Sequence, residues 1–316
     1  MDVHERWVIR HRLPDGRATD VIGWIEGITD THWSVRDRAD QLTVIERAEV
    51  VAARRVPAAP GGSGPARTSP AELEQIALTG WVAAREPLGE WTLRAGGGFT
   101  GRANSCLAVG DPEMPVLEAA ARIIGYALEH GIEPRAQVIH GSEPEAQLRA
   151  MGWSDAYVAT DVLTARLSAF LGPGLPNARV AVTEVFNERW LAAYRVSRPN
   201  TADPALLRQI LDGNAPRAFA AVSVDGDIIG IGRAHVRAEW LGLASIWTAP
   251  EHRGQGWATA LMRALGHWAA RRSARNVYLQ VAAANTGAHQ AYARLGFTKH
   301  HSYLYLAPPA EIHHGR

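Results

Sequence analysis

Arg253-Gly254-Gln255-Gly256-Trp257-Ala258 is the stretch of sequence that decides the fold of this chain. It lies between an apolar run, Leu243 to Thr248, and a run with helical apolar periodicity, Ala258 to Ala270. Glycine lets the backbone approach an anion closely, and a helix that begins at such a turn directs its unpaired N–H groups and its positive dipole end there. The turn predicts a ligand that carries a pyrophosphate, although the same glycines would also suit a plain strand-to-helix connection.

Two common phosphate motifs do not fit this turn. The Rossmann fingerprint needs three spaced glycines, an early βαβ unit and an acidic residue about twenty positions further on. A Walker loop needs Lys-Ser or Lys-Thr after the glycines, and the only lysine in the chain is Lys299.

The residues after the turn add a second block. A strand pattern over 276–281 is followed by Asn285, a short helical run through Tyr292, and Leu295-Gly296-Phe297. This order resembles the GNAT superfamily of acyl-CoA-dependent N-acetyltransferases. The resemblance is carried by Arg253-x-x-Gly256-x-Ala258, which matches the pyrophosphate motif of that family, and by Asn285…Tyr292-Ala-Arg-Leu-Gly-Phe, which matches its second block. It implies an α+β fold in which helices flank a mixed, mostly antiparallel sheet with a splayed central strand.

The resemblance also implies acetyl-CoA as co-substrate and a set of cofactor-binding residues, with no metal. The pantetheine would lie along the backbone of Ile246, Trp247 and Thr248. The pyrophosphate would lie on the N–H groups of Gly254, Gln255, Gly256, Trp257, Ala258 and Thr259, with added charge from Arg253. Asn285 would hydrogen-bond the cofactor, and its side chain would equally well cap the helix that follows.

Two residues are expected to be catalytic. Tyr292 lies two helical turns after Asn285 and therefore on the same face. The matching family tyrosine is the general acid for the leaving CoA thiolate, and a core aromatic is the alternative. Family members place a glutamate on the motif strand, but 242–244 is Gly-Leu-Ala here. Glu239 is the nearest carboxylate and our candidate base; His235 is the nearest imidazole, and a solvated strand end is the alternative for each.

The composition bounds the class of protein. The chain has 316 residues, a hydrophobic fraction of 47% and a formal net charge of +1, which is typical of a globular protein and unlike a general polyanion binder. Cys106 is the only cysteine, which excludes an intramolecular disulfide and fits a reducing cytoplasm. The polar N-terminus and the lack of an apolar run of about eighteen residues predict neither secretion nor membrane insertion.

Four segments are predicted along the chain. Residues 1–57 carry short β-patterned runs separated by turn signals and predict a small SH3-like barrel. Residues 58–70 are a Pro- and Gly-rich linker. Residues 71–175 and 176–316 repeat one plan of strand, helix, strand, helix and strand, which predicts two tandem GNAT-like units, with chance similarity as the alternative. We expect only the second to be catalytic, because Gly110-Asp111-Pro112-Glu113 replaces the glycine turn in the first and its carboxylates would repel a pyrophosphate.

These observations predict an N-acetyltransferase that moves an acetyl group from acetyl-CoA to a primary amine by direct attack in a ternary complex. The acceptor would be a small molecule, a peptide N-terminus or a lysine side chain. Tryptophans 190, 240 and 247 would line its pocket or lie in the core. The alternative is a non-catalytic acyl-CoA sensor whose barrel binds a protein or nucleic acid.

A nucleic-acid partner is a third reading, and it would use arginines of the barrel. The candidates are Arg36, Arg38, Arg54 and Arg55. Acidic residues lie beside them in the sequence and weaken this reading, so we do not expect nucleic-acid binding. The sequence leaves the oligomeric state open.

Overall fold

A computed structural model describes residues 6–36, 41–55, 64–172, 177–199, 202–213 and 216–310. Residues 56–63, which include the first part of the predicted linker 58–70, lie outside these ranges, as does Arg38. The side chain of Arg55 is likewise not described. Within the described ranges, no helix has both the length and the apolar character needed to cross a membrane.

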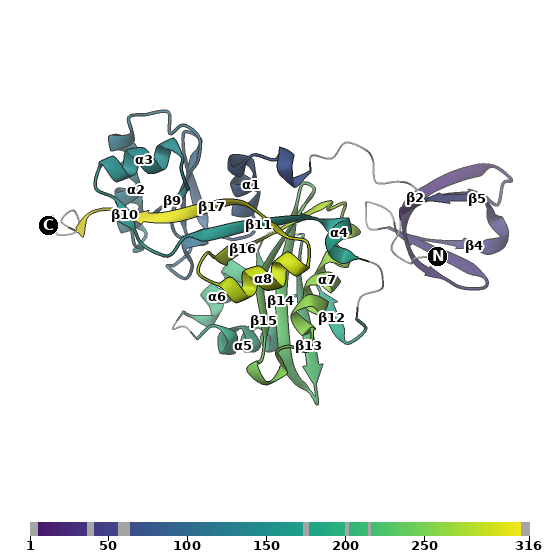
Figure 1. The fold of residues 1–316 in the computed structure, drawn as a ribbon. Helices are drawn as coiled ribbons and strands as arrows, with labels where there is room; N and C mark the ends of the chain where they lie inside the picture. The colour runs from purple at the N-terminus through teal and green to yellow at the C-terminus, as the bar shows by residue number, and fades with distance from the viewer. Residues whose placement is uncertain are drawn as a thin grey trace.

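The N-terminal segment is a five-stranded antiparallel sheet with its own core, as predicted for an all-β domain (Figure 1). Its elements are β1 (Arg6–Arg12), β2 (Ala18–Ile28), β3 (His32–Arg36), β4 (Leu42–Glu46), the 3₁₀ turn η1 (Arg47–Glu49) and β5 (Val50–Arg55). The strand order is β4-β3-β2-β1-β5. The alternating apolar residues Ile9, Ile25, Trp33, Val35 and Ile45 meet in its interior.

The first unit begins with a helix that the sequence analysis did not predict. Its elements are η2 (Pro65–Arg67), α1 (Pro70–Leu78), β6 (Ala84–Leu88), β7 (Trp91–Ala95), η3 (Gly101–Ala103), β8 (Cys106–Ala108), α2 (Val116–Glu129), β9 (Ala136–Ile139), α3 (Glu143–Ala150), β10 (Ser154–Asp155), β11 (Thr160–Arg166) and α4 (Leu167–Leu171). Ser69 accepts a hydrogen bond from the N–H of Glu72 and Pro70 is the first helical residue, so α1 carries an ordinary N-terminal signal.

The second unit contains β12 (Val180–Thr183), α5 (Glu188–Ser197), α6 (Pro204–Asp212), β13 (Arg217–Val224), β14 (Asp227–Arg237), β15 (Trp240–Thr248), η4 (Pro250–His252), α7 (Trp257–Ala270), β16 (Asn276–Ala282), α8 (Thr286–Arg294) and β17 (Thr298–Ala307). The predicted hairpin turn is present between β13 and β14, where Asp225 and Gly226 both have positive φ.

One mixed sheet runs through both units. Its strand order is β12-β13-β14-β15-β16-β11-β17-β9-β8-β7-β6, with β10 paired to β17. β11 of the first unit lies between β16 and β17, and β17 in turn pairs with β9 of the first unit. Each unit therefore contributes a strand to the edge of the other unit's sheet, and neither half of the sheet is built from one unit alone.

Helices cover both faces of the second unit's sheet (Figure 1). α7 packs on one face against Ala234 of β14 and Leu243 of β15. α5 and α6 pack on the other face, where Trp190 and Leu207 meet Ile231. Side chains alternate along a strand, so Arg233 and His235 share the α5 side with Ile231. A ligand can approach the central strands only from the α5 side, because α7 covers the other face of the sheet.

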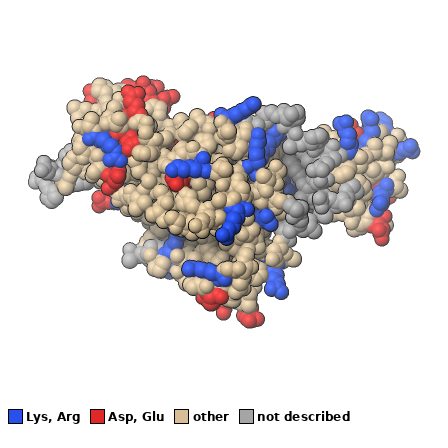
Figure 2. Space-filling view, in the orientation of Figure 1, with Lys and Arg blue, Asp and Glu red and all other residues tan. Residues whose placement is uncertain are grey.

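Charge on the surface is mixed. Figure 2 shows Lys and Arg side chains in small separate groups over the face in view, with Asp and Glu in other places on it. This agrees with the formal net charge of +1.

Candidate active site

The two central strands of the second unit diverge at one end. β15 and β16 run parallel, and their last pair joins Leu243 to Leu279. Both strands continue further, to Thr248 and Ala282. The backbone groups beyond the last pair lose their ladder partners across this gap and are available to a ligand. The predicted splayed central strand is confirmed.

A β-bulge lies in β15 just past the point of divergence. Ser245 and Ile246 together stand opposite Gly232 of β14, and Ser245 has a left-handed φ of 56°. This conformation costs a non-glycine residue about 1 kcal/mol, and such strain is often found at functional sites. Gly232 makes room for the bulge, because a Cβ there would lie 2.9 Å from Cδ1 of Ile246. The bulge releases backbone N–H groups from the ladder, as a donor to a thioester oxygen requires.

The glycine turn follows β15 and begins α7. Gly254 and Gly256 have φ values of 76° and 84°, and Gly256 is the N-cap of the helix. No side chain caps α7, and residues 254–256 are exposed. Arg253 is exposed too and donates from Nε to the carbonyl of Thr248 at 3.3 Å. An uncapped N-terminus reached through exposed glycines has the geometry of an anion site.

Asn285 and Tyr292 belong to α8, which follows β16 on the other side of the gap between β15 and β16. The Asn285 side chain accepts a hydrogen bond from the N–H of Ala288 at 3.1 Å, so it is the N-cap of α8. Burial raises the pKa of Tyr292, which keeps its phenol protonated at neutral pH, as a general acid must be.

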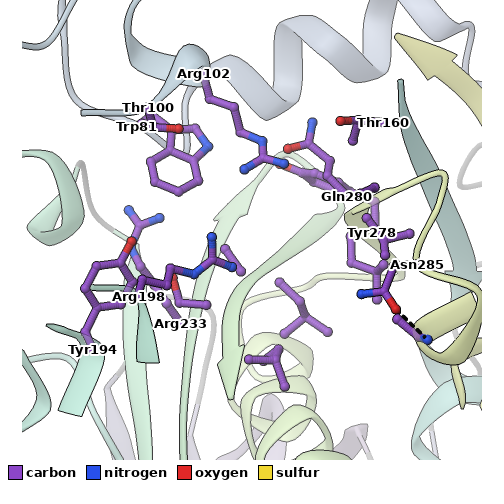
Figure 3. A pocket seen from close by; sticks show the side chains of 18 of the residues that line it. Trp81, Thr100, Arg102, Thr160, Tyr194, Arg198, Arg233, Tyr278, Gln280 and Asn285 are labelled. Carbon is purple, nitrogen blue, oxygen red and sulfur yellow. Dashed lines mark hydrogen bonds between the residues drawn. The ribbon is translucent and has the colours of Figure 1, made fainter. Parts of the chain in front are cut away.

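A cavity of about 570 Å³ lies at the gap where β15 and β16 diverge (Figure 3). Its lining comes from β14 to β16, α8, the C-terminal end of α5, and three segments of the first unit. The residues are Trp81, Phe99, Thr100, Arg102, Thr160, Tyr194, Arg198, Pro199, Arg233, His235, Leu243, Ala244, Ser245, Ile246, Tyr278, Leu279, Gln280, Val281, Ala282, Asn285, Ala288 and Tyr292. The cavity thus joins Ile246, Asn285 and Tyr292 of the predicted site. Trp247, Thr248 and the turn at 253–259 follow directly along the chain, outside its lining.

His235 forms part of the cavity wall and is held neutral. Tyr278 is 3.0 Å from its Nε2, and the ring is 6% exposed. Burial, with a smaller effect from Arg233, lowers the pKa of His235 to about 3. At neutral pH its Nε2 can therefore accept a hydrogen bond from the Tyr278 hydroxyl.

Glu239 lies apart from the cavity. It occupies the turn between β14 and β15, next to Ala238, which has a φ of 51°. Its carboxylate is 3.2 Å from Nε of Arg275, and it does not contribute to the cavity lining. The structure does not bring this sequence-based candidate for the base to the other site residues.

Several lining residues were not predicted from the sequence. Trp81, Arg102 and Thr160 belong to the first unit, which meets the second through the shared sheet and through the packing of Trp81 against α5 and α6. Arg233 had a visible signal, because it is a charged residue inside the apolar strand Ile228–Val236. Of the tryptophans expected near the acceptor, Trp190 and Trp240 are core residues, 1% and 3% exposed. The tryptophan of the cavity is Trp81.

Comparison with known proteins identifies the family. A family model described as "Probable histone acetyltransferase Rv0428c C-terminal" matches residues 70–306. The chain belongs to this family of GNAT acetyltransferases. A second model, "Rv0428c N-terminal Sm-like domain", matches residues 1–54. The all-β prediction for the N-terminus is confirmed, and the matching model is Sm-like, whereas the more specific SH3-like assignment stays a prediction.

Individual relatives of this GNAT acetyltransferase agree with the assignment. The chain is 39% identical over 83 residues to streptothricin acetyltransferase of Streptomyces lavendulae, a match that spans 26% of the chain and 44% of that relative. It is 25% identical to the uncharacterized N-acetyltransferase YobR of Bacillus subtilis (strain 168), over 73% of the chain and 96% of the relative.

Solved structures show the same fold. A GCN5-related N-acetyltransferase from Kribbella flavida superposes with a TM-score of 0.58 and 16% identity, covering 79% of this chain and 97% of its own. A putative GNAT-family acetyltransferase from Novosphingobium aromaticivorans DSM 12444 has a TM-score of 0.50 and 17% identity, covering 74% and 97%. At these identities the likeness concerns the fold of the acetyltransferase and not its substrate.

The first unit of the acetyltransferase has no comparable anion site. In the turn that precedes α2, the N–H of Asp111 donates to Glu90 Oε2 at 2.6 Å, and the N–H of Glu113 donates to Asp111 Oδ1 at 2.8 Å. Carboxylates of the protein already engage these amides, and like charge disfavours a phosphate beside them. What the first unit contributes is a wall of the cavity.

Proposed function

We propose that the protein transfers an acetyl group from acetyl-CoA to a primary amine by direct attack in a ternary complex. The observation that carries the proposal is the continuous arrangement of the uncapped N-terminus of α7, the bulge at Ser245 and the cavity that contains Tyr292. The helix N-terminus would bind the pyrophosphate, the bulge would supply backbone N–H donors to the thioester oxygen, and Tyr292 would supply the proton.

Cofactor binding rests on backbone groups. The N–H groups from Gly254 to Thr259 would hold the pyrophosphate, with Arg253 adding positive charge. The pantetheine would lie along the backbone of 246–248, whose gap-facing edge is open beyond the last β15–β16 pair. Asn285 caps α8 through its carbonyl oxygen, so its amide N–H₂ remains to donate to the cofactor.

The chemical step follows from this placement. The amine nitrogen attacks the thioester carbonyl, the carbon–sulfur bond breaks, and Tyr292 donates its proton to the departing thiolate. The product nitrogen then releases its extra proton to water, and the Tyr292 phenolate takes up a proton from water, so that the amide and free CoA thiol are formed and the phenol is restored. Glu239 has no part in this proposal, because its carboxylate pairs with Arg275 away from the cavity. Instead, Arg102, Arg198 and Arg233 in the lining disfavour an ammonium ion, so the amine is neutral when it meets the thioester.

The proposal is tested by measuring release of free CoA thiol from acetyl-CoA with a library of primary amines. Tyr292→Phe keeps the ring that packs against Phe297 and removes only the acidic proton. We expect kcat to fall about 10²- to 10⁴-fold while the Kd for acetyl-CoA, measured by calorimetry, is unchanged. An unchanged kcat would remove Tyr292 from the mechanism.

The same library distinguishes an enzyme from a sensor. Thiol release with at least one amine supports the transferase. Tight acetyl-CoA binding with no thiol release on any amine would contradict it and favour the acyl-CoA sensor.

A further inference from the structure

The fully charged side chains that line the cavity are arginines. Arg102, Arg198 and Arg233 line it, and among its described lining residues there is no aspartate or glutamate. Figure 3 shows the three side chains around Trp81, with Arg102 entering from the side of the first unit and the other two from the second. The guanidinium carbons of Arg102 and Arg233 lie 5.7 and 5.1 Å from the Trp81 ring centre.

Arg233 is a buried cation that is held in place but incompletely partnered. It is 1% exposed, and its Nε and Nη2 each donate at 2.7 Å to the carbonyls of Leu211 and Gly80. Its Nη1 is buried without a hydrogen-bond partner among the described residues. Burial lowers the pKa of Arg233 to about 10, so it remains charged at pH 7. A buried charge without a counter-ion is costly, and an anionic ligand would offset that cost.

The carboxylates that act electrostatically on Arg233 and Arg102 are hydrogen-bonded to other residues. Asp212, which acts on Arg233, accepts two hydrogen bonds from Arg217 at 2.9 and 2.6 Å. Glu74 acts on Arg102, and its two oxygens bond Gln137 at 2.5 Å and His301 at 3.0 Å. Arg102 itself donates from Nε to the hydroxyl of Tyr303 at 3.1 Å. That contact uses only Nε, and the guanidinium of this lining residue has two Nη groups besides.

We propose that the acceptor of this acetyltransferase carries an anionic group, a carboxylate or a phosphate, close to its primary amine, and that Arg233 and Arg102 bind that group. The inference rests on the proposed function, because it names the acceptor class of the same cavity. Guanidinium groups pair with either oxyanion through two parallel hydrogen bonds. Polyamines and lysine-rich peptides are repelled by the same three positive charges.

Matched amine pairs test the acceptor class by turnover. Ethanolamine against phosphoethanolamine, and phenethylamine against phenylalanine, differ by one phosphate or one carboxylate; spermidine is the polycationic comparison. We expect kcat/KM to be about tenfold or more higher for the anionic member of at least one pair, and the pair with the larger ratio distinguishes phosphate from carboxylate. Equal values within both pairs, or a preference for spermidine, would overturn the proposal.

A binding measurement keeps the test independent of catalysis. With CoA saturating, so that the turn at 253–259 is occupied, N-acetylglycine, N-acetyl-phosphoethanolamine and N-acetylputrescine are titrated by calorimetry. We expect at least one of the two anions to bind and the cation not to. If no amine turns over but an anion binds, the transferase fails while the anion site stands. If neither anion binds, or the cation binds as well as they do, the anion site is refuted.

Three variants locate the site. Arg233→Met should abolish anion binding, and Arg102→Met, at a half-buried position, provides the same test if the first variant does not fold. Arg198→Gln should weaken anion binding by about threefold to tenfold, because an exposed charge is screened by water. Arg195→Gln, on an exposed position three residues earlier in α5 and outside the cavity lining, is the matched control. Anion affinity unchanged in both Arg102→Met and Arg198→Gln would refute the assignment.

Discussion

Gly242 should be intolerant of even one added methyl group. A Cβ at Gly242 would lie 2.2 Å from Cε1 of His235 and 2.6 Å from the Tyr278 hydroxyl. The imidazole has little freedom to move away, because a Cβ at Gly80 of the first unit would also lie only 2.3 Å from its Cε1 and Tyr278 is hydrogen-bonded to it. We therefore expect Gly242→Ala to destabilise the protein by about 3 kcal/mol, the upper part of the range for overpacking. That loss corresponds to a Tm lower by roughly 6–12 °C.

Two other glycines set the scale for this measurement. A Cβ at Gly232 would meet Cδ1 of Ile246 at 2.9 Å and Cδ1 of Leu265 at 3.1 Å. These are the ends of flexible side chains, so Gly232→Ala should cost only about 1 kcal/mol. Gly125 lies in α2 with nothing within 4 Å of an added Cβ. Gly125→Ala should stabilise the helix by about 0.5–1 kcal/mol.

Urea unfolding followed by circular dichroism, with thermal unfolding alongside, measures the three variants. The order of stability should be Gly125→Ala, wild type, Gly232→Ala, Gly242→Ala. Removing the ring in a Gly242→Ala, His235→Ala double variant should recover part of the loss, which shows as a coupling free energy. Wild-type stability in Gly242→Ala, or a double variant that is as unstable as the sum of the two single variants, would refute the packing argument.

Two further predictions concern pH and cofactor binding. The pKa of His235 is lowered by burial to about 3, so below pH 6.5 the unfolded chain binds a proton that the folded protein does not. Stability should therefore fall as pH falls, by about 2 kcal/mol between pH 7.5 and 5.0, and His235→Gln should lose this part of the pH dependence in urea unfolding; equal slopes would contradict it. Arg253→Ala should weaken acetyl-CoA binding by about tenfold, less at high salt, with Arg237→Ala at the far end of β14 as control. Equal affinities for the two variants would show that Arg253 is only solvated.

The local elements of the second unit were accessible from the sequence because their signals are local. The glycine pair at 254 and 256, followed by helical periodicity, predicted α7, and Asp225-Gly226 predicted the hairpin. Asn285 could be recognised as a helix cap for the same reason. α1 was missed although Ser69 and Pro70 are ordinary helix-start residues, because the Pro- and Gly-rich composition before them masked the signal.

The sequence by itself indicated the family, which the comparisons confirm, and it predicted the repeated plan and the cofactor end of the site, since each depends on residues that are close along the chain. Only the tertiary structure shows which residues line the cavity at its arginine-rich end. Trp81 and Arg102 lie near Arg233 because the two units share one sheet and pack on each other, and such long-range contacts leave no short-range pattern in the sequence. Arg233 is buried there against Trp81 and Gly80, and its Nη1 has no hydrogen-bond partner among the residues that the structure describes. The charge of the cavity is therefore a property of the assembled sheet, as is the separation of Glu239 from Tyr292.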